Sequence, residues 1–231
     1  MVTLVLLPGM DGTGQLFAPF LSALGSGVAV KVVRYPTREP LSYTELESVA
    51  RAALPEGPFV LLGESFSGPI AISLAASGLP QLKGLVLCCT FARNPRPLFT
   101  GLRSIVAVLP VAAVPVGLLS RLLLGRFATA ALHTVFAQAL AQVSPAALRA
   151  RLRSVLSVDV SAQLRAATVP TLYLQATRDQ VVPAAASQLV SLLKPNTRVV
   201  QLDAPHFLLQ AAPTEAARIV LEFMREVQRA L

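Results

Sequence analysis

Six short hydrophobic runs recur along this 231-residue chain, and they constrain its fold more than any other feature. Each run is continuous and rich in Val and Leu rather than alternating, which is typical of strands that helices cover on both faces. We therefore predict strands at Val2–Leu7, Val28–Arg34, Phe59–Leu62, Gly84–Cys89, Thr171–Gln175 and Arg198–Leu202.

Stretches with helical periodicity lie between these runs. The predicted helices are Gln15–Leu24, Thr44–Leu54, Phe66–Ala76, Ala184–Leu193 and Pro213–Leu231. A strand followed by a helix, repeated along the chain, predicts an α/β fold. We expect a mostly parallel sheet of about six strands, flanked by helices on both sides.

The segment from residue 91 to residue 168 interrupts this alternation. It opens with the proline-rich stretch FARNPRP and continues with helix-forming residues and no strand pattern. Ser144 followed by Pro145 predicts a helix start, with the serine as N-cap. We therefore expect an all-helical cap at 91–168, inserted between two strands of a core made of residues 1–90 and 169–231.

The position of this insertion predicts a role for it. An insertion that follows a strand of a parallel sheet begins near the carboxyl end of that strand, where such folds bind their ligands. We therefore expect the cap to cover the functional site. An extra helical layer far from any site is the alternative.

Composition argues against several classes of protein. Hydrophobic residues make up 54% and charged residues 14%, which excludes a disordered chain. The longest apolar stretch, residues 105–119, is interrupted by Pro110 and Pro115, so we predict no stable membrane insertion. The first residues, MVTLVLLPGM, lack the basic region of a signal peptide, so we expect a cytoplasmic protein.

The reactive side chains suggest neither a metal nor a cofactor. Cys88 and Cys89 are neighbours in an expected strand and point to opposite faces, so they should remain free thiols. With two histidines and no C-x-x-C pair, we predict no metal site. The net charge of +8 comes without a recognised nucleic-acid motif and with only 6% aromatic residues, so we predict no nucleic-acid partner.

The stretch GESFSGP at residues 63–69 directly follows an expected strand. If Ser65 is a nucleophile, Gly63 and Ser67 are the small residues that a strand–turn–helix elbow requires two positions before and after it. Pro69 then falls in the first turn of the next helix, where proline is tolerated. If Ser67 is the nucleophile instead, Pro69 occupies a position that must be small. We therefore predict Ser65; for the motif alone, a plain turn with a capping serine is the alternative.

A serine nucleophile of this kind needs an acid and then a histidine, each after a later strand. Asp179 follows the apolar run TLYLQ, and His206 follows the run RVVQL, so both fall on loops after expected strands. The order Ser65, Asp179, His206 is the order that such enzymes use. His133 lies in an apolar helical context where a packed or hydrogen-bonded histidine is expected, and Asp203 is expected to form a turn.

The loop LLPGMDGTG, residues 6–14, follows the first expected strand and is rich in glycine. In hydrolases with this elbow, the oxyanion hole uses the N–H after the nucleophile and an N–H from an early loop. We therefore predict Phe66 and Met10 as the donors. The loop lacks the lysine of a phosphate-binding loop, which argues against a nucleotide site.

With these residues placed, the chain resembles the α/β-hydrolase superfamily over essentially its whole length. Within that superfamily it is similar to small capped bacterial carboxylesterases, including the pimeloyl-acyl-carrier-protein methyl ester esterases of biotin synthesis. The motifs that carry the resemblance are LLPGMDG, LLGESFSG, LYLQATRDQVVP and LDAPHF. The resemblance implies that Ser65 is the nucleophile, Asp179 the orienting acid and His206 the base, with Met10 and Phe66 forming the oxyanion hole.

The sequence departs from the pattern of this superfamily in three places. Pro8-Gly9 stands where the family often has His-Gly, and Ser67 stands at the second glycine of the elbow motif. The first two strands of the family's sheet are missing from the expected order of elements. None of these departures removes an expected catalytic group.

Together, the motifs and the resemblance predict a serine carboxylesterase that hydrolyses short-to-medium-chain acyl esters of small molecules through an acyl-enzyme. Met10, Phe66, Phe207 and Leu208 are the expected apolar neighbours of the substrate. A non-catalytic module that binds a small molecule or an anionic membrane surface is the alternative from another class, because fold does not fix function.

The excess positive charge lies entirely in the expected cap, which has nine arginines and one acidic residue, Asp159. Arg149 and Arg153 are four residues apart and share a helix face. One interpretation is a docking site for an acidic partner such as an acyl carrier protein, whose methyl ester or thioester would be the substrate. The alternative is a solvated arginine face that keeps an apolar cap soluble.

Overall fold

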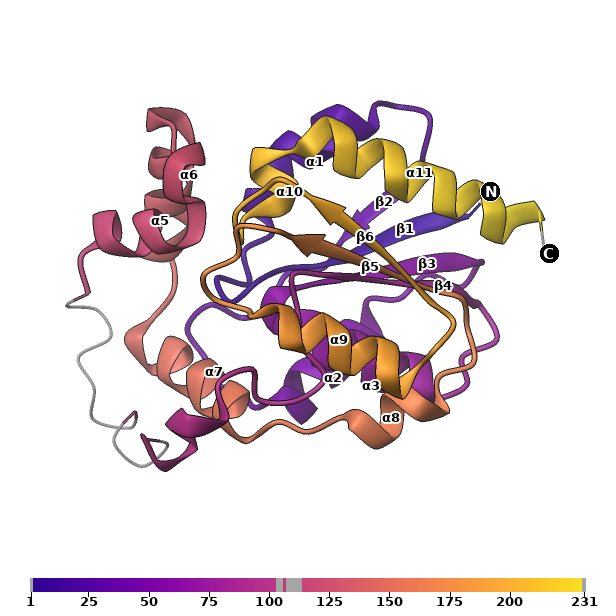
Figure 1. The fold of residues 1–231 in the computed structure, drawn as a ribbon, viewed down its shortest axis with the longest axis horizontal. Helices are drawn as coiled ribbons and strands as arrows, with labels where there is room; N and C mark the ends of the chain where they lie inside the picture. The colour runs from indigo at the N-terminus through magenta and orange to yellow at the C-terminus, as the bar shows by residue number, and fades with distance from the viewer. Residues whose placement is uncertain (1, 103–105, 107–113, 230–231) are drawn as a thin grey trace.

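The hydrophobic runs form one six-stranded sheet in the computed structural model, which describes residues 2–102, 106 and 114–229 (Figure 1). The strand order is β2-β1-β3-β4-β5-β6, and every neighbouring pair is parallel. The predicted α/β fold with a parallel sheet is therefore confirmed. The strands are β1 (Thr3–Leu7), β2 (Val30–Val32), β3 (Phe59–Glu64), β4 (Leu82–Cys88), β5 (Thr171–Ala176) and β6 (Thr197–Leu202).

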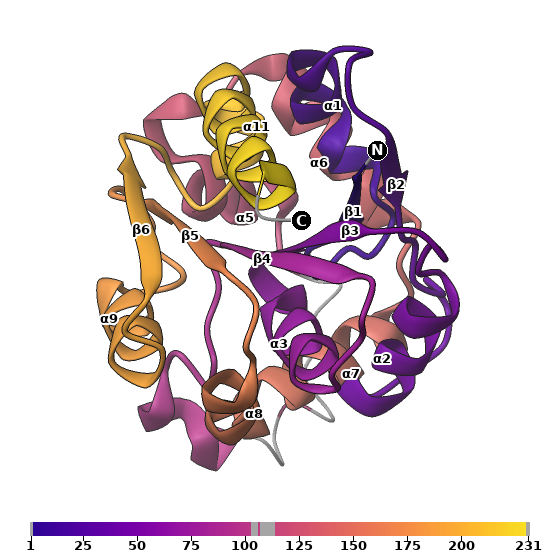
Figure 2. The same cartoon turned by 90° about the vertical axis from the view of Figure 1, so that its right-hand side faces the viewer.

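Helices cover both faces of the sheet (Figure 2). Alternate residues of a strand point to opposite faces, so β3 supplies Val60 and Leu62 to one core and Leu61 to the other. The first core lies beneath α1 (Ala18–Leu24) and α11 (Pro213–Arg229). The second lies beneath α2 (Tyr43–Ala52), α3 (Gly68–Ala76), α8 (Ser161–Ala166) and α9 (Ala184–Leu193).

The described elements between β4 and β5 are helices, apart from an isolated antiparallel bridge between Arg93 and Asp159. Ser144 caps α7 as predicted, because its Oγ accepts a hydrogen bond from the Ala147 N–H at 3.1 Å. Helices α5, α6 and α7 lie beyond the carboxyl ends of the strands, whereas α8 packs beside α3 and α9 (Figures 1 and 2). The elements are η3 (Pro97–Leu102), α5 (Val116–Leu124), η5 (Gly125–Phe127), α6 (Ala130–Ala141), α7 (Pro145–Ser157) and α8.

A few element boundaries differ from the predicted ones. Strand β2 is shorter than expected because it lies at the edge of the sheet and pairs with β1 at three residue positions. The predicted helices at 15–24 and 66–76 begin with 3₁₀ turns, η1 (Gln15–Phe17) and η2 (Ser65–Ser67). Most of the apolar stretch 105–119 lies outside the described residues. Among the residues that are described, no helix is long and apolar enough to cross a membrane.

The strand order places two loops side by side. From β1 the chain moves to β2 at the edge, then crosses back to β3 on the other side of β1. Open α/β sheets bind ligands at such a reversal, in the crevice outside the carboxyl ends of the strands. The loop after β1 and the turn after β3 border this crevice.

Candidate active site

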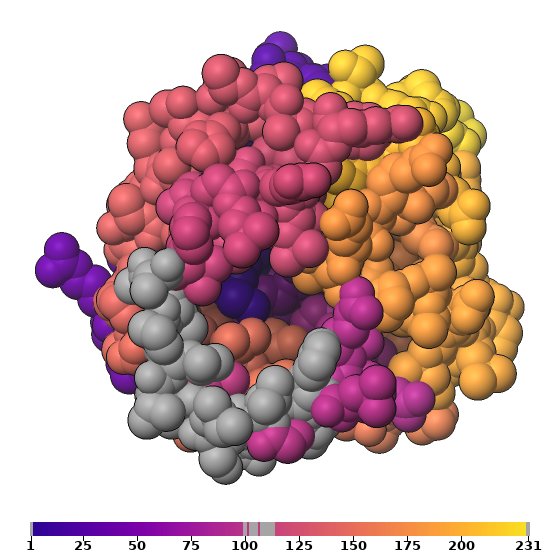
Figure 3. Space-filling model, turned by 60° about the vertical axis from the view of Figure 1, so that its left-hand side comes forward, coloured from indigo at the N-terminus to yellow at the C-terminus, as the bar shows by residue number. Residues whose placement is uncertain are grey.

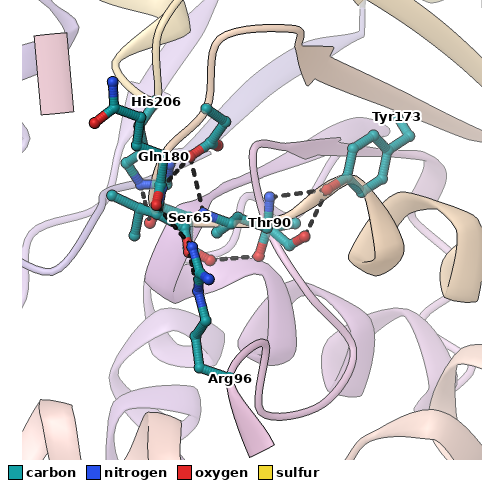
Figure 4. A network of polar contacts seen from close by, with 9 residues as sticks. Ser65, Thr90, Arg96, Tyr173, Gln180 and His206 are labelled. Atoms are coloured by element: carbon teal, nitrogen blue, oxygen red, sulfur yellow. Dashed lines mark hydrogen bonds and ion pairs between the residues drawn. The ribbon is translucent and has the colours of Figure 1, made fainter. Parts of the chain in front are cut away.

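Ser65 lies in the sharp turn between β3 and α3. Its φ is 48°, in the left-handed region that residues other than glycine rarely adopt. Neighbouring groups hold this conformation: the Thr90 hydroxyl donates to the Ser65 carbonyl, and the Tyr173 hydroxyl donates to the Thr90 carbonyl at 2.5 Å (Figure 4). The strained turn directs the Ser65 side chain toward His206.

The turn is sharp because strand β3 and helix α3 touch. A Cβ on Gly63 would lie 2.8 Å from both the Ala71 Cβ and the Ser67 carbonyl oxygen. A Cβ on Gly68 would lie 2.5 Å from the Thr90 Cγ2. The two positions with no room for a side chain are therefore 63 and 68, whereas the motif predicted close packing at 63 and 67.

Ser67 has a different task, which the motif did not indicate. Its hydroxyl donates to the Pro8 carbonyl and lies 2.8 Å from the Tyr35 hydroxyl. Because the Ser67 hydroxyl has one hydrogen, Tyr35 is the donor in the second bond. Burial raises the pKa of Tyr35 well above its usual value, so this donor keeps its proton. Ser67 thus ties the turn after β3 to the loop after β1.

Three side chains that are far apart in the sequence meet beyond the carboxyl ends of β3, β5 and β6. Ser65 Oγ lies 2.8 Å from His206 Nε2, and His206 Nδ1 lies 2.7 Å from Asp179 Oδ2 (Figure 4). The His206 and Asp179 side chains are 3% and 5% exposed, so little water competes for these bonds. Because a carboxylate only accepts hydrogen bonds, the imidazole carries its proton on Nδ1 and presents an unprotonated Nε2 to Ser65.

The loop that carries Asp179 is itself held in place. Asp179 Oδ1 accepts hydrogen bonds from the N–H groups of Val181 and Val182, both at 2.8 Å. Arg96 reaches this loop from the segment after β4 and donates to the Gln180 carbonyl at 2.8 Å (Figure 4). No sequence pattern indicated the contact of Arg96, because it joins residues 84 positions apart.

The two predicted oxyanion donors lie on either side of the crevice. Met10 is half-buried in the loop after β1, and Phe66 directly follows Ser65. The Phe66 ring is 1% exposed and stacks on Tyr43, with ring centroids 4.6 Å apart. Its side chain therefore packs in the core and is not a neighbour of the substrate. The oxyanion role of the Met10 and Phe66 N–H groups stays a prediction.

A second buried carboxyl group, which was not predicted, lies next to Ser65. Glu64 is 4% exposed and accepts a hydrogen bond from Gln210 Nε2 at 2.9 Å. Burial raises the pKa of Glu64 to about 7. The hydrogen bond from Gln210 opposes this rise in pKa, the charge of Asp11 adds to it, and the charge of His206 opposes it. The available sequence signal was an acidic residue at the end of an otherwise apolar strand.

The two predicted substrate-binding residues have different surroundings. Phe207 is half-buried, its ring packs edge-on against Phe136 of α6 at 5.3 Å, and its N–H donates to the Leu123 carbonyl of α5 at 3.1 Å. Leu208 is 0% exposed and packs in the core beneath α11. Leu208 begins the short helix α10 (Leu208–Ala211), and its side chain does not reach the site.

Two other residues that the sequence analysis considered, His133 and Asp203, take no part in the hydrogen bonds that join Ser65, His206 and Asp179. The expectation of a packed His133 was wrong, because α6 turns Phe136 inward and leaves His133 exposed. Asp203 forms ion pairs with Arg178 at 2.9 Å and Arg126 at 2.8 Å, and these partners lower the pKa of Asp203.

The molecule is hollowed on the side toward which the strands' carboxyl ends point (Figure 3). Indigo atoms of the N-terminal segment lie at the bottom of this hollow. Parts of the segment at 91–168, called the helical region below, border it in pink, and parts of the chain near α9 border it in orange (Figure 3). This is the side of the molecule on which the loops of the candidate site lie (Figure 1).

Comparison with known proteins assigns the family. Residues 4–219 match the sequence model of the alpha/beta hydrolase family. This chain belongs to that family. Over a shorter stretch, it is 38% identical to phytyl ester synthase 1, chloroplastic, of Arabidopsis thaliana. That match extends over 103 residues and covers 40% of this chain and 15% of the length of the plant protein.

Solved structures of hydrolases share the fold over nearly the whole chain. An enol-lactonase from Burkholderia xenovorans LB400 superposes with a TM-score of 0.83 at 17% identity, covering 97% of this chain and 91% of the enol-lactonase. A carboxylesterase structure from Nitrososphaera gargenis gives 0.83 at 16% identity, covering 100% and 92%. At such identities, the likeness shows the common fold alone.

We expect Glu64→Gln to remove part of the pH dependence of stability. The pKa of Glu64 is about 7 in the folded protein against 4.5 ordinarily, so between these values the folded state binds more protons than the unfolded chain. As pH rises through this window, the free energy of unfolding of the wild type should fall relative to the variant by up to about 3 kcal/mol. Urea unfolding at pH 4.5 and pH 8 measures this difference, since the other carboxylates are common to both proteins. Parallel pH dependences would contradict a buried acid at this position.

Proposed function

We propose that this protein is a serine carboxylesterase that hydrolyses short-to-medium-chain acyl esters. In this proposal Ser65 is the nucleophile, His206 the general base and Asp179 its orienting acid. The observation that carries the proposal is the continuous chain of hydrogen bonds from Ser65 Oγ through the imidazole to Asp179, at 2.8 and 2.7 Å. It lies at the carboxyl edge of the sheet in a member of the alpha/beta hydrolase family.

The reaction would proceed in two stages. His206 Nε2 takes the hydroxyl proton as Ser65 Oγ attacks the ester carbonyl carbon, and Asp179 stabilises the imidazolium. The N–H groups of Met10 and Phe66 donate to the oxyanion of the tetrahedral intermediate. The imidazolium then protonates the departing alcohol and leaves an acyl group on Ser65. In the second stage His206 activates water, which releases the acid and restores the serine.

The surroundings of His206 favour an apolar acyl group. Phe207 lies next to it, with ring centroids 6.3 Å apart, and packs with Leu16 and Phe136 in a hydrophobic cluster that also includes side chains of α5. Apolar surfaces discriminate chain length weakly, by about 1–3 kcal/mol per methylene. A range of short and medium acyl chains should therefore be accepted.

Ser65→Ala should lower the hydrolysis of p-nitrophenyl esters by about 10⁴-fold or more, because it removes the nucleophile. The variant should also fail to react with a fluorophosphonate probe while its melting temperature stays near that of the wild type. The control is Ser48→Ala, which removes the hydroxyl of an exposed serine on α2, keeps the nucleophile and should still be labelled. Undiminished turnover by Ser65→Ala would refute the proposal.

A second candidate function is transfer of the acyl group to an alcohol instead of water. The 38% identity to a relative named as an ester synthase favours it. Both reactions pass through the same acylated Ser65, and they differ only in the second nucleophile.

Product analysis separates the two functions. With a p-nitrophenyl ester as donor and a long-chain alcohol present, release of p-nitrophenol reports acylation, and mass spectrometry reports the final product. We expect the free acid to dominate, because water reaches the acyl-enzyme of an esterase. A new ester as the main product would replace hydrolysis with acyl transfer as the function.

A finer proposal concerns how the acyl group is delivered. Arg149, which is half-buried, and the exposed Arg153 line a groove on α7 together with Ser42, Ser154 and Ser157. Guanidinium and hydroxyl donors suit the carboxylates and phosphate of an acyl carrier protein. In this proposal, such a carrier docks along α7 and presents a methyl ester or thioester to the site.

Salt dependence tests this delivery. The kcat/KM for an acyl-carrier methyl ester should fall about tenfold between low and high salt, while that for a neutral p-nitrophenyl ester stays constant. The double variant Arg149→Ala/Arg153→Ala should lower only the carrier reaction. The control Arg225→Ala/Arg229→Ala removes two exposed arginines with the same spacing from α11. Equal salt responses of the two substrates would instead favour a solvated arginine face.

A further inference from the structure

Arg151 is one of the nine arginines of the helical region, but it does not face solvent. Its side chain is 1% exposed and is the largest fully buried side chain in the described part of the chain. It comes from α7 and reaches the loop after β1. A buried guanidinium destabilises a fold unless its N–H groups are hydrogen-bonded, so the identity of its partners matters.

The partners of Arg151 are backbone carbonyls. Nη1 donates to the Met10 carbonyl at 2.8 Å and to the Asp11 carbonyl at 2.9 Å, and Nη2 donates to the Pro36 carbonyl at 2.8 Å. Within residues 2–102, 106 and 114–229, no carboxylate lies within ion-pair distance of this guanidinium. Arg151 therefore joins α7 to the loops after β1 and β2 without forming a salt bridge.

Together with other hydrogen bonds, those of Arg151 hold the backbone of the loop after β1 in one conformation. Residues 9–12 form a turn closed by its own backbone hydrogen bond at 3.1 Å. The Ser67 hydroxyl donates to the carbonyl of residue 8, just before the turn. The backbone N–H of Tyr35 donates to the carbonyl of residue 12 at 2.8 Å, and the Arg151 guanidinium donates to the carbonyls of residues 10 and 11. Each N–H shares a rigid plane with the preceding carbonyl, so the bond from Arg151 to the Asp11 carbonyl also fixes the Gly12 N–H. That N–H donates to the Gly9 carbonyl, which shares its plane with the Met10 N–H, so Arg151 fixes the direction of the Met10 N–H through this turn.

The loop is shaped to accept the guanidinium. Gly12 has a φ of 72°, and a Cβ at this position would lie 2.7 Å from Arg151 Nη1. A side chain at position 12 would therefore displace the arginine as well as strain the backbone. The ring of Tyr35 lies on another side, with its centroid 6.0 Å from the guanidinium carbon.

We propose that Arg151 is a positioning residue for the oxyanion hole, which holds the Met10 amide in the direction that the transition state requires. The proposal rests on the proposed function, in which Met10 supplies an oxyanion donor. Such donors act strongly only when they are preorganised, because reorienting them during the reaction cancels their gain. The helical region then contributes to transition-state stabilisation as well as to the choice of substrate.

Arg151→Met tests the proposal through kcat. We expect kcat for a p-nitrophenyl ester to fall about 10- to 100-fold with KM changed less than about twofold, because donor alignment matters in the transition state. A trifluoromethyl ketone, which forms a tetrahedral adduct with the serine, should lose potency by a similar factor. Arg151→Lys should recover only part of the loss, because an ammonium cannot span three carbonyls on two loops. The control is Arg121→Met, which replaces an exposed arginine of α5 and should leave all these values unchanged.

Hydrogen exchange gives a readout that does not depend on catalysis. The peptide that contains residues 8–14 should exchange faster in Arg151→Met than in the wild type or in Arg121→Met. If the wild type shows neither hydrolysis nor probe labelling, the proposed function fails, and exchange alone then decides whether Arg151 fixes the loop.

Two results would overturn the role of Arg151. One is a folded Arg151→Met protein with wild-type kcat and inhibitor potency. The other is a loss of activity that matches the unfolded fraction or appears only in KM. If Arg151→Met does not fold, Arg151→Lys keeps a donor to the loop and carries the same comparison.

Discussion

The close contact between strand β3 and helix α3 is the constraint on which the candidate site depends. Gly63 leaves no room for a side chain between the two elements, and Gly68 leaves none between α3 and Thr90, so the chain must reverse within very few residues. That reversal places Ser65 in the left-handed region, a conformation that the Thr90 and Tyr173 hydrogen bonds help to hold. The hydroxyl of Ser65 is thereby brought within hydrogen-bond distance of His206, and the polar contacts of the site are arranged around it.

The frame of the molecule could be predicted because it follows from local pattern. Hydrophobic runs predicted all six strands, and Ser144 followed by Pro145 predicted the start of α7. The meeting of Ser65, Asp179 and His206 could also be expected, because each follows a strand and parallel strands end at one edge. No contact had to be known in advance for this inference.

The remaining features depend on contacts between distant segments, which spacing does not encode. Arg151 and Asp11 are 140 positions apart, and nothing in the sequence pattern distinguishes Arg151 from the other arginines of the helical region. Leu208 looked like a site residue because it is close to His206 in sequence, but the start of α10 turns its side chain into the core. His133 looked packed because its neighbours are apolar, but α6 buries only part of its surface.

The helical region is attached to the core on both sides of the crevice. On one side, α7 is joined to the loop after β1 through Arg151. On the other side, the loop after β6 contains Asp203 and Phe207. The Phe207 N–H donates to the Leu123 carbonyl of α5, and Asp203 forms an ion pair with Arg126. Helices α5 and α7 therefore cannot move away from the core together, as one rigid body, without breaking the contacts to the loop after β1 or those to the loop after β6.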